Sequence, residues 1–331
     1  MPHNKDCLMS IALLFPGQGS QVTGMGRDVA ESSKDAMELW KKAERLSGLE
    51  LRSIYWESDD AALMADTRAL QPALTVMTLT LWQAAAPLLE KKGLTPACAA
   101  GHSLGEYSAL AAAGALTADE ALEIVTLRGA LMAEADPSGR CGMAAIVKLP
   151  RSTVEEAVAE AVRTIGDPRE ILLIANYNTP AQFVVSGTKA ALDVLAPLIK
   201  ERRGRMLPLA VSGAFHSPLM ADASRKLAER LQRAEWHTPR FPVYCNVTGA
   251  ATADRHALQE LAIKQMTSSV LWIDTIRHQW EDGVTRWLEL GPKSVLAKMV
   301  RPILEDSGAA GEGLDEAAQS VGTLEAADGL H

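Results

Sequence analysis

The feature that most restricts the possible folds is the alternation of short apolar runs with stretches of helical length and spacing. The apolar runs end in glycine turns or other turn residues, as buried strands do. This alternation is typical of an α/β fold in which helices join parallel strands. We therefore predict central strands at Ile11–Phe15, Ala97–Gly101, Val243–Asn246 and Trp287–Leu290, and helices at Ala36–Leu46, Leu74–Leu89, Leu104–Ala113, Ala118–Ala135 and Pro218–Ala234.

The middle of the chain follows a different order. After the turn-like Asp136-Pro137-Ser138-Gly139, the pattern predicts the β-α-β-β-α-β order of a ferredoxin-like fold, inserted within the larger domain. Ser152 followed by Glu155 predicts a capping box at the first of its helices. The predicted elements, in chain order, are Met143–Leu149, Ser152–Arg163, Ile171–Asn176, Gln182–Ser186, Lys189–Arg203 and Arg205–Leu209.

These patterns predict a division of the chain. Residues 1–137 and 210–305 would form a large catalytic subdomain, and residues 138–209 the small inserted one. Residues 306–331 contain no Lys or Arg and are rich in Gly, Ala, Asp and Glu. We expect most of that segment to be a loose acidic tail, in which Ser320–Leu324 can still dock as a short strand.

Length and charge exclude several classes of protein. A chain of 331 residues can bury a substantial core without disulfides or a structural metal. The formal net charge of −8 at pH 7 argues against broad nucleic-acid binding, which needs a basic face. The cysteines form no C-x-x-C pair and favour a reducing cytoplasm over a disulfide framework or a zinc site. They lie far apart, at Cys7, Cys98, Cys141 and Cys245.

Two apolar segments resemble targeting or membrane signals only superficially. Leu8–Phe15 runs directly into Pro16 with no small-residue cleavage site, so we expect a buried strand rather than a signal peptide. Leu74–Leu89 is interrupted by polar residues and is shorter than the ~20 residues that span a bilayer. We expect a core helix there, and no membrane as a partner.

The strongest chemical signal is Gly101-His102-Ser103-Leu104-Gly105, which follows a small-residue strand and opens a helix. In this G-x-S-x-G setting a sharp turn lifts the serine hydroxyl clear of the sheet, and the glycines let strand and helix approach closely. The N–H of Leu104, at the helix N-terminus, would point towards a developing oxyanion. The motif alone leaves open a chance match in a glycine-rich turn.

A reactive serine needs a base within hydrogen-bond reach. His216 lies in the segment from Ser212 to Pro218, a predicted loop between a strand and a helix, where catalytic groups commonly sit. From the loop alone, a surface histidine is the alternative. His102 adjoins the serine, but neighbours on a tight elbow point apart, so we expect a structural role. The remaining histidines lie near the chain ends or in polar surroundings: His3, His331, His237, His256 and His278.

Four motifs occur in order along the chain: LFPGQGSQ at 14–21, GHSLGEY at 101–107, FHSPLM at 215–220 and ELGP at 289–292. Together they resemble the malonyl-CoA:acyl-carrier-protein transacylases and related acyltransferase domains of polyketide synthases. The resemblance runs from about Ile11 to Ile303. It implies an α/β-hydrolase-like large subdomain with a parallel sheet and a ferredoxin-like small subdomain, in agreement with the strand and helix patterns.

The resemblance implies a nucleophile and a base without a carboxylate partner. Ser103 would be the nucleophile and His216 the general base. An α/β-hydrolase places an acid between serine and histidine, whereas this family holds the histidine with a backbone carbonyl, here that of Gln265. The N–H groups of Gln18 and Leu104 would bind the oxyanion. The Gln18 segment is also explained as a tight turn after the first strand, and both interpretations can hold together.

The resemblance also implies the residues that select the acyl group. Arg128 would bind the malonyl carboxylate through two parallel hydrogen bonds, which a lysine cannot mimic. Phe215, directly before the histidine, accompanies malonyl in related domains, where a smaller residue accompanies methylmalonyl. Asn176 and Asn178 resemble asparagines near the acyl pocket, with a turn pair as the alternative, and His102 is counted with these substrate-binding residues.

The implied reaction is ping-pong transfer of malonyl from malonyl-CoA to the phosphopantetheine thiol of acyl carrier protein, without a cofactor. We expect a cytoplasmic monomer with a basic carrier-docking patch, or ordinary solvated surface, at Lys200, Arg202, Arg203, Arg205, Lys293 and Lys298. The alternatives are a serine esterase or thioesterase, a non-catalytic acyl-carrier scaffold and the malonyltransferase component of malonate decarboxylase. Fatty acid and polyketide synthesis are both open. Met1–Leu8 precedes the family's usual start, and Met9 is an alternative initiator.

Overall fold

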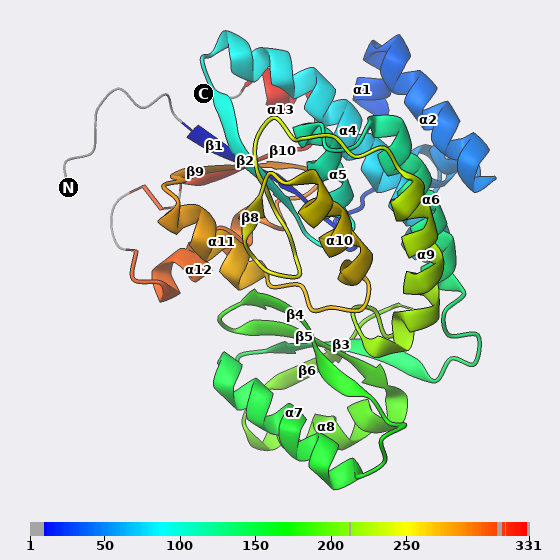
Figure 1. Ribbon diagram of the computed structural model, residues 1–331, viewed down its shortest axis with the longest axis vertical. Helices are drawn as coiled ribbons and strands as arrows, with labels where there is room; N and C mark the ends of the chain where they lie inside the picture. Colours follow the sequence, from blue (N-terminus) through cyan, green and yellow to red (C-terminus); the bar gives the residue numbers. More distant parts are fainter. Residues whose placement is uncertain (1–9, 212, 310–312, 315, 330–331) are drawn as a thin grey trace.

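A computed structural model describes residues 10–211, 213–309, 313–314 and 316–329. The predictions for Met1–Met9, and for the terminal histidines His3 and His331, concern residues outside this set. Figure 1 shows a large part made of helices and strands, and below it a smaller sheet that carries two helices on its far side.

A six-stranded sheet forms the centre of the large part, in the order β10-β9-β1-β2-β7-β8. Neighbouring strands are parallel except for the pair β7 and β8. The four predicted central strands are therefore confirmed as a parallel core. The strands are β1 (Ser10–Phe15), β2 (Thr95–Gly101), β7 (Val243–Tyr244), β8 (Ala251–Thr252), β9 (Arg286–Leu290) and β10 (Ala318–Val321).

Helices cover both faces of this sheet, which explains why its strands are apolar on both sides. Side chains alternate along β1: Ile11, Leu13 and Phe15 pack in one core, while Ala12 and Leu14 pack in the other. The helices are α1 (Arg27–Ser32), α2 (Lys34–Ser47), α3 (Ala61–Ala65), α4 (Thr67–Lys91), α5 (Gly105–Ala113), α6 (Ala118–Ala133), α9 (Ala221–Arg233), α10 (Arg255–Gln265), α11 (Trp272–Glu281), α12 (Ala297–Asp306) and α13 (Leu324–Asp328), with a π-helix at Ser53–Glu57 and a 3₁₀ turn at Pro218–Met220.

Helix α4 is longer than the predicted Leu74–Leu89. It begins at Thr67 because the side chain of Asp66 caps it by accepting the N–H of Arg68, and it continues through Pro72. Its 25 residues are long and apolar enough to cross a membrane, but 72% of its most apolar window is buried inside the structure. Core helices of soluble proteins pass the same test, and α4 packs against α2, α5 and α6.

The small part has the predicted β-α-β-β-α-β order, with strand order β4-β5-β3-β6 and antiparallel pairing throughout. Figure 1 shows both of its helices on the face turned away from the large sheet. The elements are β3 (Cys141–Val147), α7 (Arg151–Ile165), β4 (Leu172–Thr179), β5 (Gln182–Thr188), α8 (Lys189–Glu201) and β6 (Arg205–Pro208). The exact boundaries of the two subdomains stay a prediction.

The capping box predicted from Ser152 and Glu155 is wrong. Helix α7 begins one residue earlier, after Pro150, and no side chain caps its first turn. Pro150 holds the extended backbone that an N-cap requires, so Ser152 is already helical and cannot fold back. Glu155 pairs instead with Arg151, at 2.8 Å between Oε1 and Nε.

The loose tail is wrong for residues 316–329, but the short docked strand expected at Ser320–Leu324 is present, shifted by about two residues, as β10 (Ala318–Val321). Strand β10 pairs in parallel with β9, and Val321 and Ala327 are buried. The N–H of Leu324 donates to Asp28 at 2.7 Å. Burial of apolar side chains that are spaced among the acidic ones stabilises this docking. The overall composition of the segment does not reveal that spacing. Residues 310–312, 315 and 330–331 lie outside the described part of the tail.

Candidate active site

Ser103 occupies the sharp turn between β2 and α5. Its φ of 51° lies in the left-handed region, which non-glycine residues avoid unless the surroundings enforce it. A Cβ on Gly101 would lie 1.9 Å from the carbonyl carbon of Gly105, so glycine is required for strand and helix to approach this closely. The predicted elbow geometry is thus present, with the serine at its apex.

His216 lies 113 residues further along the chain, yet its Nε2 is 2.7 Å from the Oγ of Ser103. On the other side of the ring, Nδ1 lies 3.1 Å from the carbonyl oxygens of both Gln265 and Ser268. Carbonyl oxygens only accept hydrogen bonds, so Nδ1 must carry the proton and Nε2 is left to accept one. The loop histidine is therefore oriented as a base towards the serine.

Burial makes this imidazole strongly prefer its neutral form. Desolvation, assisted by the positive charge of Arg128, lowers the pKa of His216 from 6.5 to about 3, while the two backbone carbonyls act in the opposite direction. No carboxylate among the described residues hydrogen bonds to His216. The carbonyls fix tautomer and ring orientation but supply less charge stabilisation than an acid would.

Arg128 extends from α6 into the same cluster and is 1% exposed. One of its terminal nitrogens, Nη2, donates to the Oγ of Ser103 at 3.1 Å and to Oε1 of Gln265 at 3.2 Å. The other, Nη1, donates to Oε1 of Gln71 at 2.9 Å. The guanidinium is thus held by two neutral amides beside the serine hydroxyl, with no carboxylate bonded to it among the described residues.

The two predicted oxyanion donors line the cavity that contains Ser103. A Cβ on Gly17 would lie 2.5 Å from the carbonyl oxygen of His102, so the loop carrying Gln18 packs directly on the elbow. Within the described residues, the backbone N–H groups of Gln18 and Leu104 donate to no protein acceptor. Two free N–H groups in the same cavity as a serine hydroxyl are an arrangement that could bind an oxyanion.

The cavity around these groups has a volume of about 410 Å³. Phe215, Asn176 and Asn178 line it as predicted, and so does His102. The Nε2 of His102 lies 2.8 Å from Oδ1 of Asn178, and burial lowers the pKa of His102. This contact ties the elbow to β4 of the small part, so His102 and Asn178 bond to each other rather than projecting freely.

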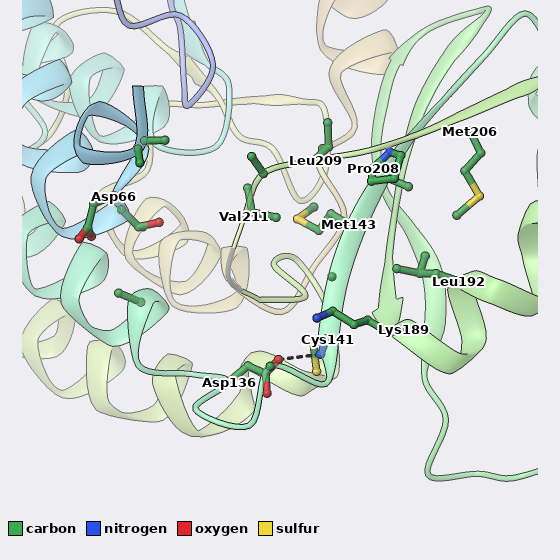
Figure 2. Close-up of a pocket in the computed structure, with 18 of the residues that line it drawn as sticks. Asp66, Asp136, Cys141, Met143, Lys189, Leu192, Met206, Pro208, Leu209 and Val211 are labelled. Carbon is green, nitrogen blue, oxygen red and sulfur yellow. Dashed lines mark hydrogen bonds between the residues drawn. The ribbon is translucent and has the colours of Figure 1, made fainter. Parts of the chain in front are cut away.

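Figure 2 shows residues that line a second cavity, of about 990 Å³. The two cavities share five lining residues, Ala65, Met143, Leu209, Ala210 and Val211. The larger one contains neither Ser103 nor His216, and its acidic rim includes Asp66 and Asp136, the latter accepting the N–H of Cys141. The chemistry therefore belongs to the smaller cavity despite its size.

Four contributors to the site were missed by the sequence predictions: Gln71, Glu106, Asn246 and Ser268. Two signals were available. Glu106 is an acid inside the otherwise apolar start of a core helix, and Asn246 ends a predicted parallel strand, where functional groups of α/β sheets gather. Gln71 and Ser268 offered none, because only the tertiary fold brings them to the cluster.

The cysteine and acidic side chains of the described residues form no metal-binding cluster. Cys98, Cys141 and Cys245 are free thiols. Within the described part of the chain, His, Cys, Asp and Glu side chains form no group of three that could hold a metal ion.

Comparison with known proteins places this geometry in context. The acyl transferase domain family matches residues 12–327. The malonyl CoA-acyl carrier protein transacylase of Bacillus subtilis (strain 168) is 37% identical over 297 residues, covering 89% of this chain and 91% of the relative. The protein of that name from Staphylococcus aureus (strain MRSA252) is 35% identical over 296 residues, covering 89% and 92%.

Solved structures of proteins with related names have a similar fold. An acyl carrier protein S-malonyltransferase from Vibrio cholerae O1 biovar eltor superimposes with a TM-score of 0.85 at 32% identity, covering 97% of this chain and 99% of the other. A malonyl-transacylase solved in complex with its type II PKS acyl-carrier protein gives a TM-score of 0.83 at 32% identity, covering 96% and 97%.

Proposed function

Because the chain belongs to the acyl transferase domain family, we propose that it transfers malonyl from malonyl-CoA to the phosphopantetheine thiol of acyl carrier protein. The observation that carries this proposal is the convergence of two groups on one oxygen. The Oγ of Ser103 lies 2.7 Å from the Nε2 of His216 and 3.1 Å from the guanidinium of Arg128. The relatives named for this reaction support the choice of substrates.

The proposed reaction has two half-reactions. In the first, Oγ of Ser103 attacks the thioester carbonyl carbon and its proton passes to Nε2 of His216. The carbon–sulfur bond then breaks, and His216 returns the proton to the leaving CoA sulfur. In the second, the carrier thiol loses its proton to His216 and its sulfur attacks the carbonyl carbon of the malonyl ester. The bond from that carbon to Oγ of Ser103 then breaks, and His216 returns the proton to Oγ. No redox step or cofactor enters this balance.

The oxyanion of each tetrahedral intermediate would be bound by the N–H groups of Gln18 and Leu104, which have no protein acceptor among the described residues. Removing one such donor typically costs about 3–4 kcal/mol of transition-state stabilisation. A thioester is already an activated donor with a good leaving group, so a base held only by carbonyls is sufficient for this chemistry.

Arg128 would select a dicarboxylic acyl group. Its planar fork can exchange the neutral amides of Gln71 and Gln265 for the malonyl carboxylate, gaining charge-assisted hydrogen bonds. Phe215 lies in the same cavity and would favour malonyl over methylmalonyl, although one extra methyl is rejected by only ~1–3 kcal/mol.

The decisive experiment separates transfer from hydrolysis. The protein is mixed with malonyl-CoA and phosphopantetheinylated carrier protein, and malonyl-carrier and free malonate are quantified over time by mass spectrometry. We expect malonyl-carrier to accumulate at least tenfold faster than malonate. Release of malonate alone would identify a thioesterase instead, and loss of malonyl from CoA without either product would contradict the reaction as written.

The carrier protein would dock on cations beside the cavity mouth. Lys200, Arg203 and Arg205 are exposed near β6, which leads into the cavity-lining Leu209, and Lys293 and Lys298 are exposed on either side of Val295 and Leu296. Arg202 is a weaker candidate than the sequence suggested, because it pairs with Glu160 and bonds to the carbonyl of Leu198.

Charge reversal tests this patch. We expect Arg203→Glu combined with Arg205→Glu to raise the KM for carrier protein about tenfold and to leave the KM for malonyl-CoA unchanged. Arg163→Glu is the matched control and should change neither constant, because Arg163 is exposed on α7 and lines neither cavity. Equal KM values for carrier protein in the double variant and the wild type would remove the patch from the proposal.

The cytoplasmic location, the monomeric state and the choice between fatty acid and polyketide synthesis remain predictions. The transfer assay addresses the last of these directly when it is repeated with carrier proteins from each type of pathway.

A further inference from the structure

Asn246 lies just beyond the end of β7 and is completely buried behind the nucleophile turn. Its side chain contacts the peptide groups on both sides of that turn. Oδ1 accepts the backbone N–H of Ser103 at 2.7 Å, and Nδ2 donates to the carbonyl oxygen of Gly101 at 2.6 Å. One amide therefore spans the turn from the last residue of β2 to the nucleophile itself.

This contact falls where the backbone most needs support. Ser103 is held at a φ of 51°, and such conformations persist only where the surroundings impose them. The amide of Gln265 binds the other side of the same residue, donating from Nε2 to the carbonyl oxygen of Ser103 at 3.0 Å. Asn246 and Gln265 thus fix both peptide groups of the nucleophile.

Glu106 in turn fixes Asn246. It lies in the first turn of α5, is 1% exposed, and its Oε2 accepts the backbone N–H of Asn246 at 2.6 Å. Burial raises the pKa of Glu106 to about 7, against the opposing effect of this N–H. Neither Glu106 nor Asn246 lines the catalytic cavity, so neither touches the substrate there.

We propose that Asn246, held by Glu106, is a positioning residue that keeps the Ser103 hydroxyl aligned with His216 for attack. The proposal rests on the proposed role of Ser103 as nucleophile. Its prediction is specific: loss of Asn246 should slow acylation of Ser103 without weakening the binding of malonyl-CoA, because the carboxylate clamp and the cavity wall remain in place. A misplacement of ~1 Å at a reacting group can cost on the order of 100-fold in rate.

The first measurement is the single-turnover rate of malonyl-Ser103 formation. We expect Asn246→Ala to reduce the maximal rate about 100-fold while the malonyl-CoA concentration for half-maximal rate changes less than twofold. Gln279→Ala is the matched control: Gln279 is also buried and accepts the indole N–H of Trp287, but it lines neither cavity, and its variant should keep the wild-type rate. A loss confined to apparent substrate affinity would overturn the proposal.

Variants of Glu106 test whether it acts through Asn246. Glu106→Gln retains an acceptor for the Asn246 N–H and should keep the rate within about threefold of wild type. Glu106→Ala removes the acceptor and should slow acylation at least tenfold. The double variant Asn246→Ala with Glu106→Ala should be no slower than Asn246→Ala alone. Multiplying losses in the double variant would show that Glu106 acts independently and would contradict the proposed linkage.

Reactivity towards phenylmethylsulfonyl fluoride separates this inference from the proposed substrate. Ser103 Oγ displaces fluoride from sulfur and its proton passes to His216, with no need for malonyl-CoA. We expect Asn246→Ala to slow this modification about as much as it slows acylation, even if malonyl-CoA proves to be the wrong donor. Should Asn246→Ala fail to fold, as judged by near-ultraviolet circular dichroism, Asn246→Ser and Glu106→Ala replace it, and wild-type reactivity in folded variants would overturn the proposal.

Discussion

Replacing Ser103 with alanine is expected to abolish covalent labelling of the protein by radioactive malonyl-CoA and to reduce transfer to carrier protein on the order of 10⁶-fold. The reason is that Oγ is the atom to which His216 and Arg128 both point. Alanine keeps the Cβ, so the turn at a φ of 51° experiences the same steric environment and the fold should be retained. Label is counted on the protein after denaturation and gel separation.

Ser108 offers a matched control for this substitution. It is a buried serine on the same helix, α5, and its Oγ lies 2.8 Å from that of Thr78, away from the catalytic cavity. Ser108→Ala should therefore remain fully labelled. Label that persists on Ser103→Ala at the wild-type level would transfer the nucleophile's role to another residue, which peptide mapping would identify.

The sequence was sufficient for the parts of the fold that depend on local patterns. Strands β1, β2 and β9 are apolar runs ending at turns, and α5 and α6 are runs of helical length made mostly of small and apolar residues, so each was predicted to within a few residues. Helices α10, α11 and α12 were missed. Each is only 10 or 11 residues long, and Pro302 lies inside α12, where a proline argues against a helix. The helical spacing is nevertheless present in α12, which buries Val300, Ile303 and Leu304.

The residues of the site also differ in whether local sequence could reveal them. The Ser103 elbow is a local event, fixed by residues 101–105, and it could be found without any homologue. His216 was a candidate from its loop, but a surface histidine was the alternative until the family resemblance was added. Arg128 could be singled out only through that resemblance, since an arginine on a helix has a common structural explanation. Asn246 contacts the cluster from the segment after β7 and Gln71 from α4, so their role depends on tertiary packing that no short motif encodes.

Glu289 shows how a recognised motif can have a role that its sequence does not reveal. It lies in the ELGP motif, is completely buried, and accepts the N–H groups of Val295 and Ala297 at 3.1 and 2.8 Å. Burial raises the pKa of Glu289 to about 7, opposed by those N–H groups. Val295 and Leu296 line the catalytic cavity, so this carboxyl group shapes one of its walls from behind.

The second large effect is expected at Arg128. Under the proposed role of Arg128, Arg128→Ala would remove two hydrogen bonds to the malonyl carboxylate, each worth about 1.5–3 kcal/mol for a charged partner. The kcat/KM for malonyl-CoA should therefore fall about 10²- to 10⁴-fold, while that for acetyl-CoA, which has no carboxylate, should change far less. Arg128→Lys keeps the charge without the planar fork, so its kcat/KM for malonyl-CoA should lie between those of the wild type and of Arg128→Ala. Competition between the two donors, read as the ratio of acyl-carrier products, measures the shift directly.

The same substitution should move the pH dependence in a direction that the loss of the positive charge of Arg128 determines. His216 accepts a proton only when neutral, so activity falls as pH drops through its pKa, which burial and the charge of Arg128 hold well below 6.5. Removing that charge raises the pKa of His216 and shifts the acidic limb of the kcat/KM profile for acetyl-CoA to higher pH. An acidic limb that stays in place, together with an unchanged preference for malonyl over acetyl, would mean that the guanidinium neither binds the carboxylate nor sets the protonation of the base.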